Sequence, residues 1–140
     1  MSGTRFSTPE EAEAGFYKAF EDGDLEAMMA VWATGDDVVC IHPLRPRLVG
    51  LDLIKESWSQ IFRHSPKMKI EINNRQHLQV GDLAVHVLNE NFLIGGEAGD
   101  QSPVLATNVY RLTDLGWRMI LHHASPLTRT APDAGPPVLH

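Results

Sequence analysis

The spacing of apolar residues changes once along this chain, near residue 66, and this change restricts the fold more than any other feature of the sequence. Before it, apolar residues recur at the roughly three- to four-residue spacing of helices with one buried face. From residue 68 to residue 126 they alternate with polar residues, as in strands that bury one face. Helices followed by strands predict an α+β fold, and 140 residues suffice for one such domain.

Three helices are expected in the first half of the chain. The first is predicted to begin after Thr8, whose side chain is placed to cap it, and to end at Gly23. Asp24 is placed to cap a second, shorter helix over residues 25–33. The third is predicted over residues 51–64, "LDLIKESWSQIFRH", where the apolar residues again fall on one face.

The rest of the chain predicts a sheet. The run "DDVVCIHP" indicates a short strand that ends at His42–Pro43. Long strands are then expected over residues 68–80, 83–94, 104–113 and 117–124, and the turns between them predict an antiparallel meander. A sheet of this kind must bury one face against the helices. We therefore expect a cone, in which a curved antiparallel sheet wraps around the N-terminal helices and leaves a pocket at its mouth.

Composition and charge exclude several classes of protein. The net charge of −6, without any run of Lys or Arg, argues against a nucleic-acid partner, and no apolar stretch reaches the length of a membrane span. Cys40 is the only cysteine, and the N-terminus lacks the apolar segment of a secretion signal, so we expect a cytoplasmic protein. We assign residues 1–126 to the domain and residues 127–140 to a Pro-rich tail that lies over the surface or is partly disordered.

Alternation also predicts which side chains face the interior. We place Arg111 and Arg118 on the outer face of the last two strands. Alternation then points the following side chains of these strands inward: Ala106, Asn108, Tyr110, Met119, Leu121, His123 and Ser125. On this basis His123 faces a pocket and His122 faces out. The strand 83–94 leaves two inward sets open, because a bulge of one residue exchanges them. These sets are Ala84, His86, Leu88, Glu90 and Phe92, or Val85, Val87, Asn89 and Asn91.

Four segments in this order resemble the SnoaL-like and ketosteroid-isomerase-like superfamily, which shares the fold of nuclear transport factor 2. They are "EDGDLEAMMAVWA", "CIHP", "LVGLDLIKESW" and "GWRMILHHASP", and the resemblance covers roughly residues 8–126. It implies the cone-shaped fold. The superfamily includes isomerases, cyclases, dehydratases and modules that only bind or assemble, so the fold alone does not select a reaction.

The resemblance to ketosteroid isomerases implies functions for three positions. Phe16 stands where those enzymes carry a tyrosine that donates to the oxyanion, and it has no donor. His42, before Pro43, takes the place of the aspartate base, and Asn108 takes the place of a second oxyanion donor. His42 and Asn108 are polar, like the residues they replace, but their chemistry differs from that of the isomerase residues, so steroid isomerisation is not expected.

A second resemblance is to the association domain of calmodulin-dependent kinases. Its basis is "DGDLEA", "LVGLDLIK" and "WRMILHHASP". This resemblance implies that Glu90, Asn108 and His123 face inward. Where that domain carries arginines in its pocket, this chain has Glu90 and Asn108, so an anion pocket of that type is not expected.

These observations lead to one catalytic hypothesis and one rival. The hypothesis is a cofactor-independent isomerase, cyclase or dehydratase that moves a proton on a small apolar carbonyl compound. In it His42 is the base, Asn108 the carbonyl donor, and Glu90 or His123 the partner. The rival is a non-catalytic binding or assembly module, with His42 bonded to a loop carbonyl and Glu90 exposed. Candidate ligand contacts are Phe16, Phe20, Trp32, Trp58, Phe62, His86 and Tyr110, which any small core would also require.

Two further expectations concern metals and partners. His86, His122, His123 and Glu90 have no spacing that enforces a tetrahedral site, so we expect neither a metal nor another cofactor. The resemblance, together with outward apolar residues such as Val109 and Ile120, implies a homodimer through the outer face of the sheet.

Overall fold

Three helices precede the long strands, as the sequence predicts. The computed structural model describes residues 4–65, 67–94, 97–98 and 103–127, so the predicted tail lies outside the described residues from 128 on. The helices are α1 (Pro9–Asp22), α2 (Leu25–Val31) and α3 (Leu51–His64). None of the helices in the described part of the chain is long and apolar enough to cross a bilayer.

The ends of α1 confirm the capping residues. The Thr8 hydroxyl accepts a hydrogen bond from the Glu11 amide at 3.1 Å, and Gly23 ends the helix in the left-handed conformation with φ 64°. The second helix ends at Val31 rather than at residue 33, because Trp32 is extended and forms a bridge with Met119 of the sheet.

One curved sheet contains all the strands of the described residues. They are β1 (Val39–Ile41), β2 (Leu48–Val49), β3 (Met68–Val80), β4 (Leu83–Ile94), β5 (Glu97–Ala98), β6 (Val104–Thr113) and β7 (Gly116–Pro126). Their order is β2-β1-β7-β6-β4-β3, and β5 pairs with β4. The long strands form the predicted antiparallel meander, whereas β1 runs parallel to β7. The very short β2 and β5 were not predicted.

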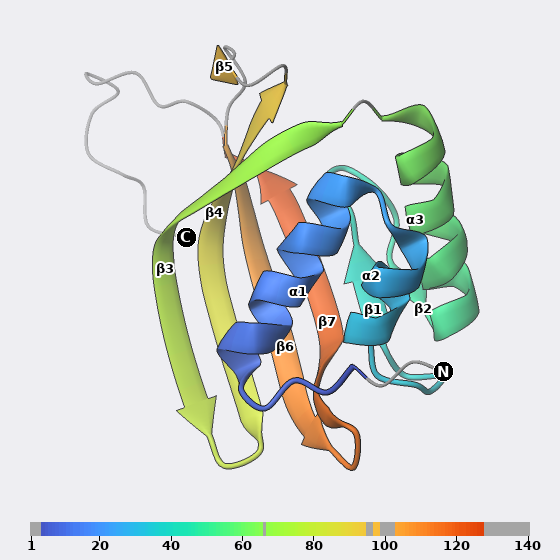
Figure 1. The fold of residues 1–140 in the computed structure, drawn as a ribbon, viewed down its shortest axis with the longest axis vertical. Helices are drawn as coiled ribbons and strands as arrows, with labels where there is room; N and C mark the ends of the chain where they lie inside the picture. Colours follow the sequence, from blue (N-terminus) through green and yellow to red (C-terminus); the bar gives the residue numbers. More distant parts are fainter. Residues whose placement is uncertain (1–3, 66, 95–96, 99–102, 128–140) are drawn as a thin grey trace.

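The core lies between the helices and one face of this sheet. Figure 1 shows α1 across that face and α3 beside the end of the sheet that carries β1 and β2. Fully buried side chains from both layers fill the space: Phe16, Met28, Trp32, Ile54, Trp58, Leu88, Tyr110 and Met119. The burial pattern of β4 selects the first of the two sets left open, with Ala84, His86, Leu88 and Glu90 buried and Phe92 packed against the core.

A bulge in β7 reverses the predicted orientation of the two histidines. Tyr110 pairs with Met119 and Val109 pairs with Leu121, so Ile120 is an extra residue without a partner in β6. Every side chain after Ile120 therefore points to the face opposite to the one predicted from Met119.

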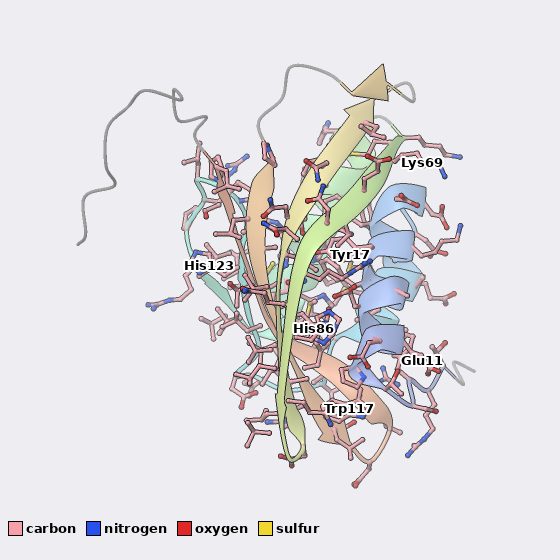
Figure 2. The ribbon with its side chains drawn as sticks, turned by 90° about the vertical axis from the view of Figure 1, so that its left-hand side faces the viewer. Glu11, Tyr17, Lys69, His86, Trp117 and His123 are labelled. Carbon is pink, nitrogen blue, oxygen red and sulfur yellow. The ribbon has the colours of Figure 1, made fainter. Side chains whose placement is uncertain are left out.

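The consequence for the site is a correction. His122 is 1% exposed and faces the core, whereas His123 is exposed. Figure 2 shows His123 on the side of the sheet away from α1. The predicted inward positions of Leu121, His123 and Ser125 are wrong, because the prediction assumed unbroken alternation. The predicted inward positions of Ala106, Asn108, Tyr110 and Met119 are confirmed.

Candidate active site

Four polar side chains from α1, β4, β6 and β7 form a chain of hydrogen bonds inside the core. Tyr17 Oη lies 2.5 Å from Glu90 Oε2, Asn108 Nδ2 lies 3.0 Å from Tyr17 Oη, and His122 Nδ1 lies 2.6 Å from Asn108 Oδ1. All four residues are buried. Buried polar groups of this kind are stable only when they bond to one another, so the four act as one unit.

The hydrogen bonds of this chain run in one direction. The Asn108 carbonyl oxygen can only accept, so His122 Nδ1 carries the proton and donates to it. The Asn108 amide donates to the Tyr17 oxygen, and the Tyr17 hydroxyl donates to Glu90. Each bond polarises the next toward the carboxylate, and His122 Nε2 is left unprotonated.

Burial determines the charge states at both ends of the chain. It raises the pKa of Glu90 from 4.5 to about 7, against the opposing effect of the Tyr17 hydrogen bond. It lowers the pKa of His122 from 6.5 to about 3, helped by the nearby His42 and His123. Near neutral pH, His122 is thus uncharged and Glu90 exchanges a proton readily, which is the property of an acid–base group.

His42 directly follows β1, and its ring lies next to His122, the last residue of the buried chain of hydrogen bonds. Its ring centroid is 6.3 Å from that of His122, and Trp58 of α3 packs against both rings, at 4.9 Å and 6.1 Å. Burial, followed by the charge of Arg45, lowers the pKa of His42 from 6.5 to about 4. The imidazole is therefore neutral at pH 7.

The tautomer of His42 follows from Ser57 of α3. The Ser57 hydroxyl has one hydrogen, which it donates to the Ile54 carbonyl oxygen at 2.8 Å. His42 Nε2, 3.0 Å from Ser57 Oγ, must then be the donor in that contact. This leaves His42 Nδ1 with a free lone pair, as a general base requires.

His42 forms part of the wall of an open pocket of about 440 Å³. Four apolar residues and three further polar residues complete the lining: Pro43, Pro46, Leu48, Ile61, Arg45, Ser57 and Gln60. A pocket that combines apolar walls with a few polar groups is typical of sites for small organic molecules. A larger pocket, of about 480 Å³, lies between Trp32 and Arg118, away from the buried chain, and contains no histidine.

Most of the predicted aromatic contacts form one cluster beside His42. Phe16, Phe20, Trp58 and Phe62 pack edge to face or tilted, with centroids 4.8–6.1 Å apart. One buried donor in this cluster, Trp58 Nε1, has no hydrogen-bond partner among the described residues; Tyr110 Oη, which also has none, belongs to a ring that packs against His86 at 5.0 Å. An unpaired buried donor requires an explanation, and a ligand oxygen would supply the missing acceptor.

The remaining predicted contacts lie elsewhere. Trp32 lines the larger pocket, and His86 is buried against Glu13 of α1, with His86 Nδ1 2.8 Å from Glu13 Oε1. Burial raises the pKa of Glu13, but the hydrogen bond from His86 and the charges of His86, Arg75 and His77 outweigh burial and leave it below 4.5. His86 thus belongs to a second polar cluster.

The structure brings together three of the four predicted catalytic residues. His42, Asn108 and Glu90 lie around the same part of the core, whereas His123 does not, because of the bulge. Tyr17, which supplies the hydroxyl that Phe16 lacks, and Ser57 were not predicted. One signal for Tyr17 was available: it is the one tyrosine in α1 and stands beside Phe16.

Comparison with known proteins agrees with this fold. The model of the SnoaL-like domain matches residues 10–129. A structure from Thiobacillus denitrificans, assigned as a calcium/calmodulin-dependent protein kinase type II association domain, is 42% identical. It covers 89% of this chain and 99% of its own, with a TM-score of 0.84. A structure from Streptomyces avermitilis, assigned as a dehydratase of the NTF2-like family, is 32% identical, covers 87% and 100% of the two chains and has a TM-score of 0.77.

A curated relative is more distant. The F-box protein SKIP8 of Arabidopsis thaliana is 26% identical over 110 residues, and the match covers 79% of this chain. The match spans about half the length of that relative, at 46%. Taken together, the matched family model, the two similar structures and the cone-shaped sheet show that this chain belongs to the SnoaL-like domain family and has the NTF2-like fold.

Proposed function

We propose that this protein binds a small, largely apolar carbonyl compound in the His42 pocket and moves a proton on it without a cofactor. The observation that supports this most directly is the neutral His42, with a free Nδ1, beside a buried hydrogen-bond chain that ends at Glu90. His42 removes a proton next to the carbonyl group, and a donor in the pocket wall, such as the Arg45 guanidinium, binds the carbonyl oxygen. Isomerisation, cyclisation and dehydration all begin with this step.

Glu90 is a positioning residue in this proposal. It anchors the chain Tyr17–Asn108–His122, and His122 lies next to His42. The similarity to the Streptomyces avermitilis structure supports a reaction of the dehydratase class.

The second candidate function is a binding or assembly module. It is favoured by the 42% identity to a structure assigned as an association domain. In this alternative the same pocket holds a ligand, and His42 serves only to bind it. The two functions differ in one observable, which is whether a carbon–hydrogen bond of the ligand exchanges.

Proton exchange next to a carbonyl group tests the proposal directly. Cyclohexanone and acetophenone are incubated with the protein in deuterium oxide, and deuterium incorporation is followed by proton NMR. We expect exchange above the buffer rate, reduced roughly 10²- to 10⁴-fold in His42→Gln, since loss of a general base has this effect. Glutamine keeps a donor for Ser57, so the fold is preserved.

The pH profile of exchange distinguishes His42 from Glu90 as the base. With His42 as base the rate rises through about pH 4 and is flat near neutrality; with Glu90 it would rise through about pH 7. Circular dichroism confirms the pH range in which the protein is folded. Binding without exchange at any pH would favour the module, and a rise near pH 7 would contradict the role given to His42.

We propose further that two copies associate through the outer face of the sheet. Cross-strand pairing places Leu78, Val85, Val109 and Leu121 in one row over four strands, and Val39 of β1 continues it. Leu78 is 63% exposed and the others are half-buried. A continuous apolar row on a face that none of the described helices covers suits a second copy of the same surface. A cytoplasmic location stays a prediction.

Sedimentation measures this association. We expect a dimer for the native chain and a monomer for Val109→Lys, because a charge at the centre of the row would be buried without a partner. Leu53→Lys, at an exposed position of α3, is the control and should stay dimeric. A monomeric native protein would contradict the proposal.

A further inference from the structure

A second polar cluster lies on the other side of the core, where α1 faces β3 and β4. His77 and His86 pair across the two strands and stack, with ring centroids 3.6 Å apart and an angle of 8°. Glu10 and Glu13 of α1 flank them on opposite sides. Figure 2 shows His86 between the sheet and α1.

The two carboxylates have different roles. Glu13 is 6% exposed and lies 2.8 Å from His86 Nδ1, 3.4 Å from His77 Nε2 and 3.1 Å from Arg75 Nε. As an acceptor, it holds a proton on His86 Nδ1, so that in the neutral imidazole the lone pair lies on His86 Nε2. His86 Nε2 and His77 Nδ1 then point to the other carboxylate, Glu10.

On the Glu10 side, three ligand atoms converge. Glu10 Oε2 lies 3.3 Å from His77 Nδ1 and 3.8 Å from His86 Nε2, and the three atoms all lie within 4.8 Å of one another. Zinc bonds of about 2.0–2.2 Å in a tetrahedron require ligand atoms about 3.4 Å apart. Two imidazoles and one carboxylate are a zinc ligand set, and a carboxylate behind a ligating histidine is its usual outer partner.

We propose that Glu10, His77 and His86 bind a divalent transition-metal ion of the zinc type, with Glu13 as the positioning residue behind His86. Arg75 pairs with Glu13 alone, so the Glu10 carboxylate is left to attract a cation. Binding requires one adjustment: stacked rings have parallel lone pairs, so His77 must rotate toward the ion. Its side chain is 30% exposed and lies on the edge strand β3, which leaves it room to do so.

This site differs from the set of histidines considered in the sequence analysis. Of those residues only His86 takes part, because His122 faces Asn108 and His123 faces out. The site is also separate from the His42 pocket, so binding at the two can be tested independently.

Cobalt and zinc are the probes for this site. The full chain is titrated with Co²⁺, and the visible absorption of tetrahedral cobalt is followed, then displaced with Zn²⁺. We expect one equivalent of cobalt to bind, zinc to displace it and Mg²⁺ to have no effect, because nitrogen ligands select against magnesium. His77→Ala, at a half-exposed edge position, should abolish stoichiometric binding while the circular dichroism spectrum is unchanged.

Two more variants make the test specific. Glu13→Gln keeps all three ligands and is expected to weaken zinc binding about 10- to 100-fold, as loss of an outer-shell partner does. His64→Ala, at an exposed histidine of α3, is the matched control and should bind as the native chain does. Equal binding by His77→Ala and the native chain, or the absence of tetrahedral cobalt absorption, would overturn the proposal.

Discussion

Trp58→Ala is expected to lower the free energy of unfolding by about 3–5 kcal/mol, the cost of removing a large aromatic side chain from a core. Trp58 is fully buried and packs against Phe16 at 5.6 Å, Phe20 at 4.8 Å and His42 at 4.9 Å. Trp58 is the larger of the two buried side chains of α3, the other being Ile54, so its removal leaves a large void in the core. Urea unfolding followed by far-ultraviolet circular dichroism measures the change.

A matched substitution on the same helix tests the explanation. Leu53 is 57% exposed, so Leu53→Ala is expected to change the free energy of unfolding by less than about 0.5 kcal/mol. Equal losses for Leu53→Ala and Trp58→Ala would mean that α3 does not pack through Trp58. Such a result would also contradict the packing of Trp58 against the His42 ring.

Glu90→Gln is expected to stabilise the protein at pH 8 by an amount on the order of 3 kcal/mol, since burial raises the pKa of Glu90 from 4.5 to about 7. Between about pH 4.5 and pH 7 the folded protein holds a proton on Glu90 that the unfolded chain has lost. The native stability therefore falls as the pH rises from about 4.5 to about 7 and then levels off. Glutamine is neutral throughout and still accepts from Tyr17, so the variant should lack this slope.

Two buried histidines, His42 and His122, change the stability with pH in the opposite direction to Glu90, so their effect must be separated from that of Glu90. The pKa values of His42 and His122 are lowered to about 4 and about 3, so acid below pH 6.5 protonates them in the unfolded chain first. Their contribution to stability is present above pH 6.5 and is lost as the pH falls through about 4 for His42 and about 3 for His122. Because Glu90→Gln leaves both histidines in place, the difference between variant and native protein isolates Glu90.

Urea unfolding of both proteins at several pH values between 5 and 8 measures this difference. Glu71→Gln, at an exposed glutamate of β3, is the control and should follow the native curve. A difference between Glu90→Gln and the native protein that does not grow with pH would show that Glu90 is not a buried acid.

Much of the fold could be predicted because local chemistry determines it. Thr8 and Gly23 are read as helix ends since a capping hydroxyl and a left-handed glycine act within a few residues. The bounds of α3, β3, β4 and β6 likewise agree with the predicted ranges. Alternation in β6 correctly placed Asn108 in the core, because that strand pairs with β4 without interruption.

The candidate site was only partly predictable. The bulge at Ile120 depends on how β7 bends to follow β6, and no residue type in "RMILHH" marks it. For that reason His122 and His123 were assigned to the wrong faces. Tyr17 was missed because the resemblance directed attention to Phe16, and adjacent helix positions differ in direction by about 100°.

The sequence by itself determined that helices come first, that a curved antiparallel sheet follows and that Glu90 and Asn108 were candidates for its interior. Only the tertiary structure decided which polar groups meet. Tyr17 reaches Glu90 across 73 positions, and Glu13 reaches His86 across another 73. Contacts over such separations are determined by register, bulges and the docking of α1 on the sheet, which depend on the whole packed core.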